Sequence, residues 1–154
     1  MKRTIAALLI AALGAQAAWA AAPSLLARTK EITRKESMYL MGGKEHRSKR
    51  ELRIVVLIPP DMTDDELIAV SDHYRAKLAA KAIIYVMFWD DAAAYKRFIG
   101  TEDEEDIPVE VNDHNKARYE KDPFRVYGSP VHHLQLLKPA TDRRFTTARR
   151  TISY

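Results

Sequence analysis

The feature that most constrains the fold is an apolar strand, a capped helix and a second apolar strand in the centre of the chain. Residues 52–58 (LRIVVLI) are rich in β-branched side chains and end at Pro59-Pro60, which cannot continue a hydrogen-bonded ladder. Residues 82–89 (AIIYVMFW) carry no charge. Such runs are typical of interior strands that are buried on both faces.

The segment between these strands begins with a complete helix-start signal. Thr63 is the expected N-cap, and Glu66 completes a capping box with it. Asp64 and Asp65 place negative charge at the positive end of the helix dipole. Apolar residues then recur at helical spacing, which predicts a helix over 63–80. A strand, a helix and a strand with short joints predict a parallel βαβ unit.

Weaker patterns flank this unit. Residues 37–41 and 131–137 indicate strands, and residues 92–100 indicate a short helix. Residues 107–111 alternate weakly, and residues 112–124 are polar with a helical leaning. The sequence therefore predicts an α/β (α+β) fold, a small two-layer domain with a mixed sheet of about four strands and helices on one face.

The first twenty residues are typical of a cleaved secretory signal peptide. A positively charged start precedes the unbroken apolar run 5–13, and the triplet Ala18-Trp19-Ala20 suits a signal peptidase. Ala20-Ala21-Ala22 offers a second cleavage site, and an uncleaved N-terminal anchor is the alternative. We therefore expect a periplasmic or secreted protein that is cleaved near Ala20 or Ala22.

The rest of the chain predicts a single domain. Of the 154 residues, 134 follow the signal segment, which suffices for one apolar core. The absence of cysteine excludes disulfides, so the domain must rely on that core. No later apolar run reaches membrane-spanning length. We expect a loose lead-in over 21–36, a globular α/β domain over 37–139, and a basic tail or edge strand over 140–154.

Charge is sorted into blocks along the chain. The signal segment holds two of the 25 basic residues and none of the 21 acidic ones, so the remainder has a formal net charge of +2. Residues 28–53 hold nine basic and four acidic side chains, residues 61–113 five and fourteen, and residues 116–150 nine and three. The blocks either neutralise one another in the fold or present an acidic face and basic arms to a charged partner.

Carboxylates follow both central strands, at the edge where open α/β sheets usually bind ligands. Since parallel strands end at the same edge, these aspartates could form one acidic rim, with two nearby aromatic side chains as anchors for a partner. The candidate binding residues are Asp61, Asp64, Asp65, Trp89, Asp90, Asp91 and Tyr95. The alternative is structural, because helices favour acidic residues at their start and the aromatic residues could belong to the core.

No motif for catalysis, metal binding or cofactor binding is present in the sequence. The histidines form no HExxH or His-x₃-His pair, and His132 and His133 should point to opposite faces of a strand. No serine lies in a G-x-S-x-G elbow, and no glycine-rich loop suits a phosphate. We therefore predict no catalytic residue, no metal site and no cofactor.

These observations favour a small exported non-enzymatic binding protein of the cell envelope, of the inhibitor, immunity-type or accessory-factor kind, whose partner is another protein. The first rival is a small envelope hydrolase that uses the rim carboxylates with a histidine, His114, His132 or His133. The second rival is a binder of anionic polymer or lipid through basic arms. Those arms would contribute Arg143, Arg144, Arg149 and Arg150. No nucleic-acid-binding motif is present.

Overall fold

The central strand–helix–strand unit forms as the sequence predicts. A computed structural model of the protein describes residues 23–40, 48–101, 107–123, 129–139 and 147–154. It contains β2 (Ser48–Leu57), α2 (Asp64–Lys77) and β3 (Ile83–Trp89), and β2 and β3 are parallel neighbours. The capping box is confirmed. The Thr63 hydroxyl accepts from the N–H of Glu66, and the Glu66 carboxylate accepts from the N–H of Thr63 at 2.8 Å.

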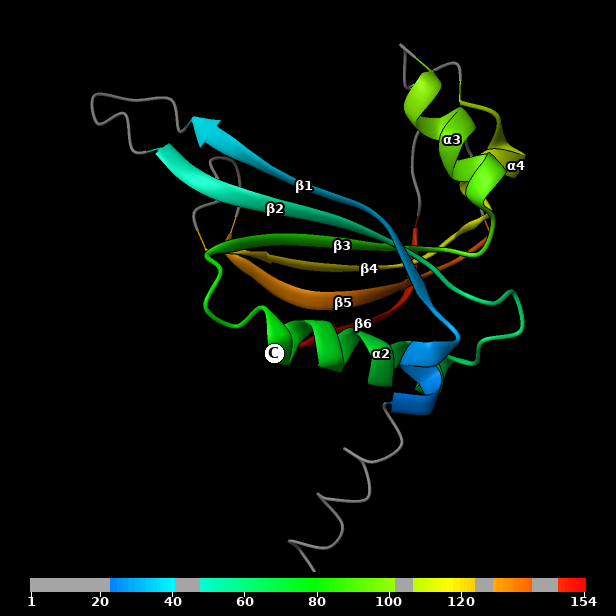
Figure 1. Ribbon diagram of the computed structural model, residues 1–154, viewed down its shortest axis with the longest axis horizontal. Coiled ribbons are helices and arrows are strands. Elements are labelled where there is room, and N and C mark those ends of the chain that lie inside the picture. The colour runs from blue at the N-terminus through cyan, green and yellow to red at the C-terminus, as the bar shows by residue number, and fades with distance from the viewer. Residues whose placement is uncertain (1–22, 41–47, 102–106, 124–128, 140–146) are drawn as a thin grey trace, which may run out of the picture.

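The sheet has six strands where the sequence predicts about four. The remaining strands are β1 (Lys30–Leu40), β4 (Asn115–Asp122), β5 (Val131–Leu137) and β6 (Ala148–Ser153). The order is β1-β2-β3-β4-β5-β6, and every neighbouring pair except β2–β3 is antiparallel. The described chain is therefore an α+β domain with a six-strand mixed sheet around a parallel βαβ unit (Figure 1).

Two of the expected flanking elements have different bounds or a different type. β1 begins at Lys30, inside the segment 21–36 that we expected as a loose lead-in. β4 lies in the polar segment 112–124, where a helix was the expectation. In both strands the side chains on one face of the sheet are polar, so neither strand contains an unbroken apolar run like those of β2 and β3. β6 lies in the segment 140–154, for which the sequence left a tail and an edge strand open.

A third difference concerns the weakly alternating residues 107–111. Part of this segment forms the one-turn helix α4 (Val109–Asn112), which follows Pro108 as its N-cap. The apolar residues Ile107 and Val111 are 5% and 1% exposed, so burial at a four-residue spacing explains them better than strand alternation does. The short apolar run was therefore assigned the wrong period.

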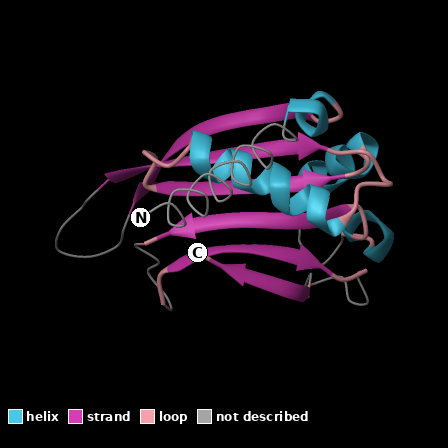
Figure 2. Ribbon diagram, turned by 90° about the horizontal axis from the view of Figure 1, so that it is seen from below, coloured by secondary structure: helices cyan, strands magenta, loops and turns pink. Residues whose placement is uncertain are grey.

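The apolar residues form two clusters on opposite faces of the sheet. Ile54 and Val86 face α2, whereas Val55 and Trp89 belong to the cluster under α3 (Ala92–Gly100) and α4. Figures 1 and 2 show α2 lying along one face, with α3 and α4 over one end of the other. The expectation that the helices lie on one face is therefore wrong. Among the described residues, no helix is long and apolar enough to span a membrane.

Polar contacts attach the edge strand β6 to the rest of the domain. Two guanidinium nitrogens of Arg149 bind the two carboxylate oxygens of Asp64 at the start of α2. The Nε of Arg149 donates to the carbonyl oxygen of Leu137 at 3.1 Å. The guanidinium of Arg75 on α2 lies 4.4 Å from the ring centre of Tyr154. Cationic side chains thus hold β6 and the following Tyr154 against α2, in addition to the pairing of β6 with β5.

The Arg149→Met substitution should lower the free energy of unfolding by about 1 kcal/mol, because it removes the paired contact with Asp64 and the bond to Leu137 while keeping the apolar stem. Arg150→Met is the matched control. Arg150 lies next to Arg149 and acts on Asp64 through charge alone, so its loss should cost less than about 0.5 kcal/mol. Chemical denaturation followed by circular dichroism measures both values, and equal effects would contradict the assignment.

The same pair predicts a pH dependence. The hydrogen bond that Arg149 donates to Asp64 holds the pKa of Asp64 below its ordinary value of 3.8. A lowered folded-state pKa stabilises the fold above the ordinary value, and this contribution is lost as the pH falls through the folded-state value. The stability difference between the wild type and Arg149→Met should therefore shrink below pH 3.8. A difference that stays constant down to about pH 2 would contradict this origin.

Candidate functional site

The predicted acidic rim is divided between the two faces of the sheet. The C-terminal ends of β2 and β3 are adjacent, as expected for parallel neighbours. However, β2 leads to α2 on one face and β3 leads to α3 on the other (Figure 1). The aspartates after β2 and those after β3 therefore form two groups with different surroundings.

The aspartates that follow β2 lie among basic residues of the same chain. Asp61 binds Arg28 at 3.0 Å, and Asp64 binds Arg149. Asp65 is exposed in the first turn of α2. Arg28 and Arg149 come from the two basic blocks that flank the acidic block in the sequence. For Asp61 and Asp64, mutual neutralisation of the blocks therefore accounts for the charges.

The two aromatic candidates lie in the core. Trp89 and Tyr95 are 0% and 8% exposed, and they pack with Phe98 in the cluster under α3 and α4. The ring centre of Trp89 lies 5.5 Å from that of Tyr95 and 5.1 Å from that of Phe98. Neither side chain is available as a surface anchor for a partner, so that interpretation is wrong and the core interpretation describes them.

The strongest cluster of titratable side chains lies where β3 ends and β4 begins. We call Asp90, His114 and Lys116 the β3-end site. The side chain of Asp90 is 7% exposed, with one carboxylate oxygen 2.7 Å from Nδ1 of His114 and the other 3.2 Å from Nζ of Lys116. The backbone N–H of Asp90 also donates to the carbonyl oxygen of His114 at 3.0 Å. Strand pairing thus holds this carboxylate against the imidazole.

Asp91, the next residue, has a structural role. Its carboxylate accepts from the backbone N–H groups of Ala93 at 2.6 Å and Ala94 at 2.9 Å, and so caps α3. The same hydrogen bonds hold the pKa of Asp91 below its ordinary value of 3.8. The adjacent aspartates Asp90 and Asp91 therefore differ in role, because one binds an imidazole and the other satisfies a helix terminus.

The β3-end site has the composition of an acid–base or hydrogen-bonding site. A carboxylate bound to Nδ1 orients an imidazole and makes Nε2 the nitrogen that meets a ligand. The His114 side chain is 39% exposed, so solvent reaches part of the ring. Among the described residues, no group of three or more histidine and acidic side chains could hold a metal ion. Proton transfer or ligand binding is therefore the chemistry that this arrangement fits.

A second polar arrangement crosses the face of the sheet opposite α2. One residue from each strand contributes to it, and each is the register partner of the next, so all six lie on the same face. We call this set the polar row, and it comprises Lys35, Arg53, Tyr85, Glu120, His133 and Ser153. Row-like pairing of this kind brings neighbouring side chains within about 5 Å at Cβ. The row therefore forms one continuous band of polar side chains.

Carboxylates on this face are buried beneath longer side chains. Glu51, Glu120 and Asp122 are 3%, 8% and 1% exposed. Arg53 forms an ion pair with Glu51, and the Tyr85 hydroxyl donates to Asp122 at 3.1 Å. Burial and the negative charge of Asp122 raise the pKa of Tyr85. The Arg53 side chain is 59% exposed, so a cation covers an anion that solvent barely reaches.

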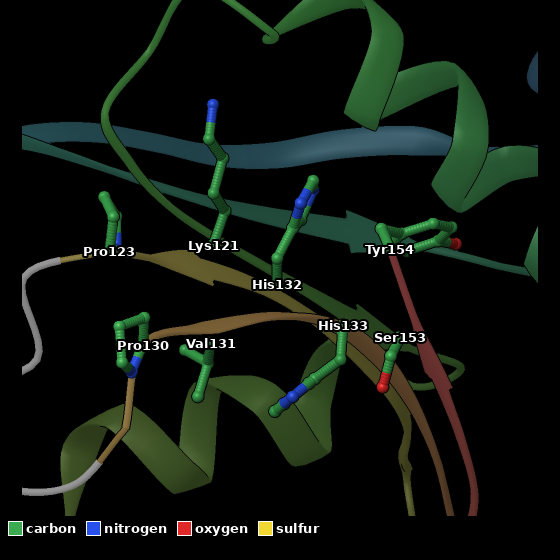
Figure 3. A pocket seen from close by; sticks show the side chains of 8 residues that line it. All are labelled: Lys121, Pro123, Pro130, Val131, His132, His133, Ser153 and Tyr154. Carbon is green, nitrogen blue, oxygen red and sulfur yellow. The ribbon is translucent and has the colours of Figure 1, made fainter.

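A hollow of about 350 Å³ lies at the opposite ends of β4 and β5 from the β3-end site. Figure 3 shows its lining on both sides of the strands, with Lys121, His132 and Tyr154 on one side and His133 and Ser153 on the other. The two adjacent histidines thus point to opposite faces, as the sequence predicts. The polar groups that line the hollow on the α2 side form hydrogen bonds with other residues of the same chain.

Two side chains on the α2 side of this hollow form these bonds. His132 Nε2 lies 3.1 Å from the Tyr119 hydroxyl, and burial lowers the pKa of this imidazole. Lys121 Nζ donates to the carbonyl oxygens of Ala79 and Lys81, each at 2.9 Å. The Lys121 contacts hold β4 against the loop after α2, and the His132 contact joins β5 to β4, so the polar groups on this side of the hollow bind within the domain. His133 and Ser153, on the other side of the hollow, belong to the polar row.

Sequence reasoning identified only part of these arrangements. Asp90 was a candidate residue and His114 a candidate partner for a hydrolase, but Lys116 was missed. In the polar row, only His133 was a candidate, as a possible histidine of the hydrolase, and the other five residues were missed. For Lys116 and Glu120, the signal that could have found them is the alternation in KARYEKD, where polar residues at every second position indicate a strand with one charged face.

Comparisons of the chain with protein-family models, with curated proteins and with solved structures found no match.

The β3-end site predicts a specific tautomer of His114. The bond to Asp90 should place the proton of the neutral imidazole on Nδ1, and nitrogen NMR of the ring distinguishes the two tautomers. Asp90→Asn should shift the population toward the Nε2–H form. Asp91→Asn is the matched control, because asparagine also caps helices and the His114 tautomer should not change. An Nε2–H tautomer in the wild type would refute the assigned geometry.

Proposed function

We propose that the chain is a small exported non-enzymatic binding protein of the cell envelope, whose partner is another protein that docks on the face opposite α2. The observation that carries this proposal is the polar row with its buried carboxylates. Export rests on the signal segment, with cleavage near Ala20 or Ala22, and residues 1–22 lie outside the described part of the chain. An inhibitor, an immunity-type protein or an accessory factor would each fit this proposal.

Free-energy considerations support the choice of face. Burying a carboxylate is costly unless an opposite charge and hydrogen bonds compensate, and apolar side chains would stabilise a covered face at least as well. The face toward α2 follows that apolar pattern. The opposite face instead carries Glu51, Glu120 and Asp122 with their partners, and α3 and α4 cover one end of it (Figure 1). Polar residues kept at this cost favour a role in recognition.

The basic-arm hypothesis has less support. Arg143 and Arg144 lie outside the described residues. Arg149 and Arg150 are both exposed in β6, but Arg149 binds Asp64 and Leu137 within the domain. A surface for anionic polymer would need several such cations on one side.

The test is capture of a partner from envelope extract with two matched double variants. Lys35→Glu with Arg53→Gln alters the exposed cations of the polar row, and Lys96→Glu with Arg97→Gln makes the same changes on α3. The first pair should weaken capture of a specific protein about tenfold or more, whereas the second should leave it unchanged. Cross-linking should map the partner to the strands of the polar row, β1–β6.

Circular dichroism must show that both double variants are folded. Capture of the same protein by both variants at the wild-type level would refute docking on this face. Binding of small molecules or metal ions alone, without any protein partner, would refute the binding-protein proposal as a whole.

A second candidate function is a small envelope hydrolase, and the Asp90–His114 contact of 2.7 Å is the observation that favours it. A carboxylate that orients an imidazole is a recurring general-base arrangement. In this reading His114 Nε2 would accept a proton from an attacking water, while Asp90 would hold the ring and stabilise its charged form. No nucleophilic side chain among the described residues contacts His114.

The hydrolase candidate is tested with ester, amide, phosphodiester and glycoside substrates. If His114 is a general base, His114→Gln should lower the turnover of the active substrate by about 10²–10⁴-fold. His73→Gln on α2 is the control, because His73 lies in a different element and should not affect turnover. Absence of turnover by the wild type, or an equal loss in both variants, would exclude His114 as a general base.

A further inference from the structure

Two buried polar atoms lack hydrogen-bond partners where β3 meets β4. They are the indole nitrogen Nε1 of Trp89 and the amide oxygen Oδ1 of Asn115, and neither has a partner among the described residues. Trp89 is 0% and Asn115 7% exposed. The two residues are register partners on adjacent strands, so their side chains lie on the same face of the sheet. A buried donor and a buried acceptor without partners thus occur side by side, and native structures rarely leave such groups unsatisfied.

The immediate neighbours of these residues form the β3-end site. Asp90 follows Trp89 and His114 precedes Asn115, and these neighbours are joined by a side-chain contact of 2.7 Å and a backbone hydrogen bond of 3.0 Å. Asp90 and His114 are therefore bonded to each other, whereas Trp89 Nε1 and Asn115 Oδ1 are not. A bulge causes the difference, since the register shifts between Phe88 and Trp89.

The two atoms restrict the chemistry of anything that binds both of them. The indole N–H only donates, and the amide oxygen only accepts. A single ligand atom that binds both groups must therefore accept from Trp89 and donate to Asn115. An ionised carboxylate or phosphate has no proton to donate, and an ammonium group or a metal ion cannot accept. A hydroxyl oxygen meets both requirements.

We propose that Trp89 Nε1 and Asn115 Oδ1 bind one hydroxyl group, which bridges the end of β3 and the start of β4 under α3 and α4. The hydroxyl belongs to a water molecule or to a small neutral alcohol. The surroundings suit either source, because the rings of Tyr95 and Phe98 supply an apolar wall next to Trp89. The C-terminal ends of parallel strands are also where open α/β sheets bind ligands.

This site is independent of the proposed function. Docking of a protein partner depends on the polar row and is tested at Lys35 and Arg53. The hydroxyl site depends on Trp89 and Asn115, so either proposal can fail while the other holds.

The experiment uses the full chain with Trp19→Phe, which leaves Trp89 as the sole tryptophan. The indole N–H then gives a single ¹⁵N-labelled NMR signal. A cross-relaxation signal between the indole proton and a long-lived water identifies water as the source. A saturable shift of the indole signal on titration with glycerol, with loss of the water signal, identifies an alcohol. Either result supports the proposal.

The Asn115→Leu substitution removes the acceptor at similar volume. It should abolish the water signal or weaken glycerol binding about tenfold or more, whereas Gln135→Leu on β5 should change neither. A wild-type chain with neither signal, or signals that persist unchanged in Asn115→Leu, would overturn the proposal. If Asn115→Leu does not fold, the wild-type measurements decide by themselves.

Discussion

The structure depends on the parallel pairing of β2 with β3, because these two strands are buried on the α2 face and, around Val55 and Trp89, on the other face as well. Each face of a doubly buried strand needs a cover, and one helix cannot supply two. α2 covers the row that contains Ile54 and Val86, and α3 and α4 cover part of the row that contains Val55 and Trp89. The connection after β2 and the connection after β3 therefore leave the sheet on opposite sides. As a result, the aspartates after β2 and those after β3 lie on different faces, although the sequence predicts a single acidic rim.

The elements that could be predicted are those whose own residues show both that the element is buried and where it begins or ends. Residues 52–89 combine apolar runs, prolines and a capping box, and there the predicted and observed elements agree closely. β1 and β4 could not be predicted in the same way. Ala117 and Tyr119 are buried, but the intervening Arg118 and Glu120 face the polar side of the sheet, so the segment resembles a polar helix in sequence. The alternation over 116–122 is a weak signal of a strand, and pairing with β3 and β5 decides its type.

The same limit applies to the candidate sites. Asp90 could be singled out because topology places it at the end of a parallel strand. The structure places His114, which directly precedes β4, against it and adds Lys116 from β4, a strand that the sequence did not predict. Trp89 and Tyr95 were misjudged because proximity to charged residues in the sequence says little about burial. A large aromatic residue at the end of an interior strand is usually covered by the helix that follows it. Here α3 has that position.

Charged side chains in two parts of the domain differ in how deeply they are buried. Arg28 and Arg149 bind aspartates at the start of α2, on the outside of the domain, where water screens each pair and the contacts chiefly hold chain segments together. Glu51 and Asp122 are instead buried on a sheet face and covered by Arg53 and Tyr85. Removing Arg53 would take away the ion pair of the buried Glu51 carboxylate, which restricts how this face can change. A face so constrained keeps a fixed pattern of donors and charges, and this pattern is what the proposed docking of a protein partner would use.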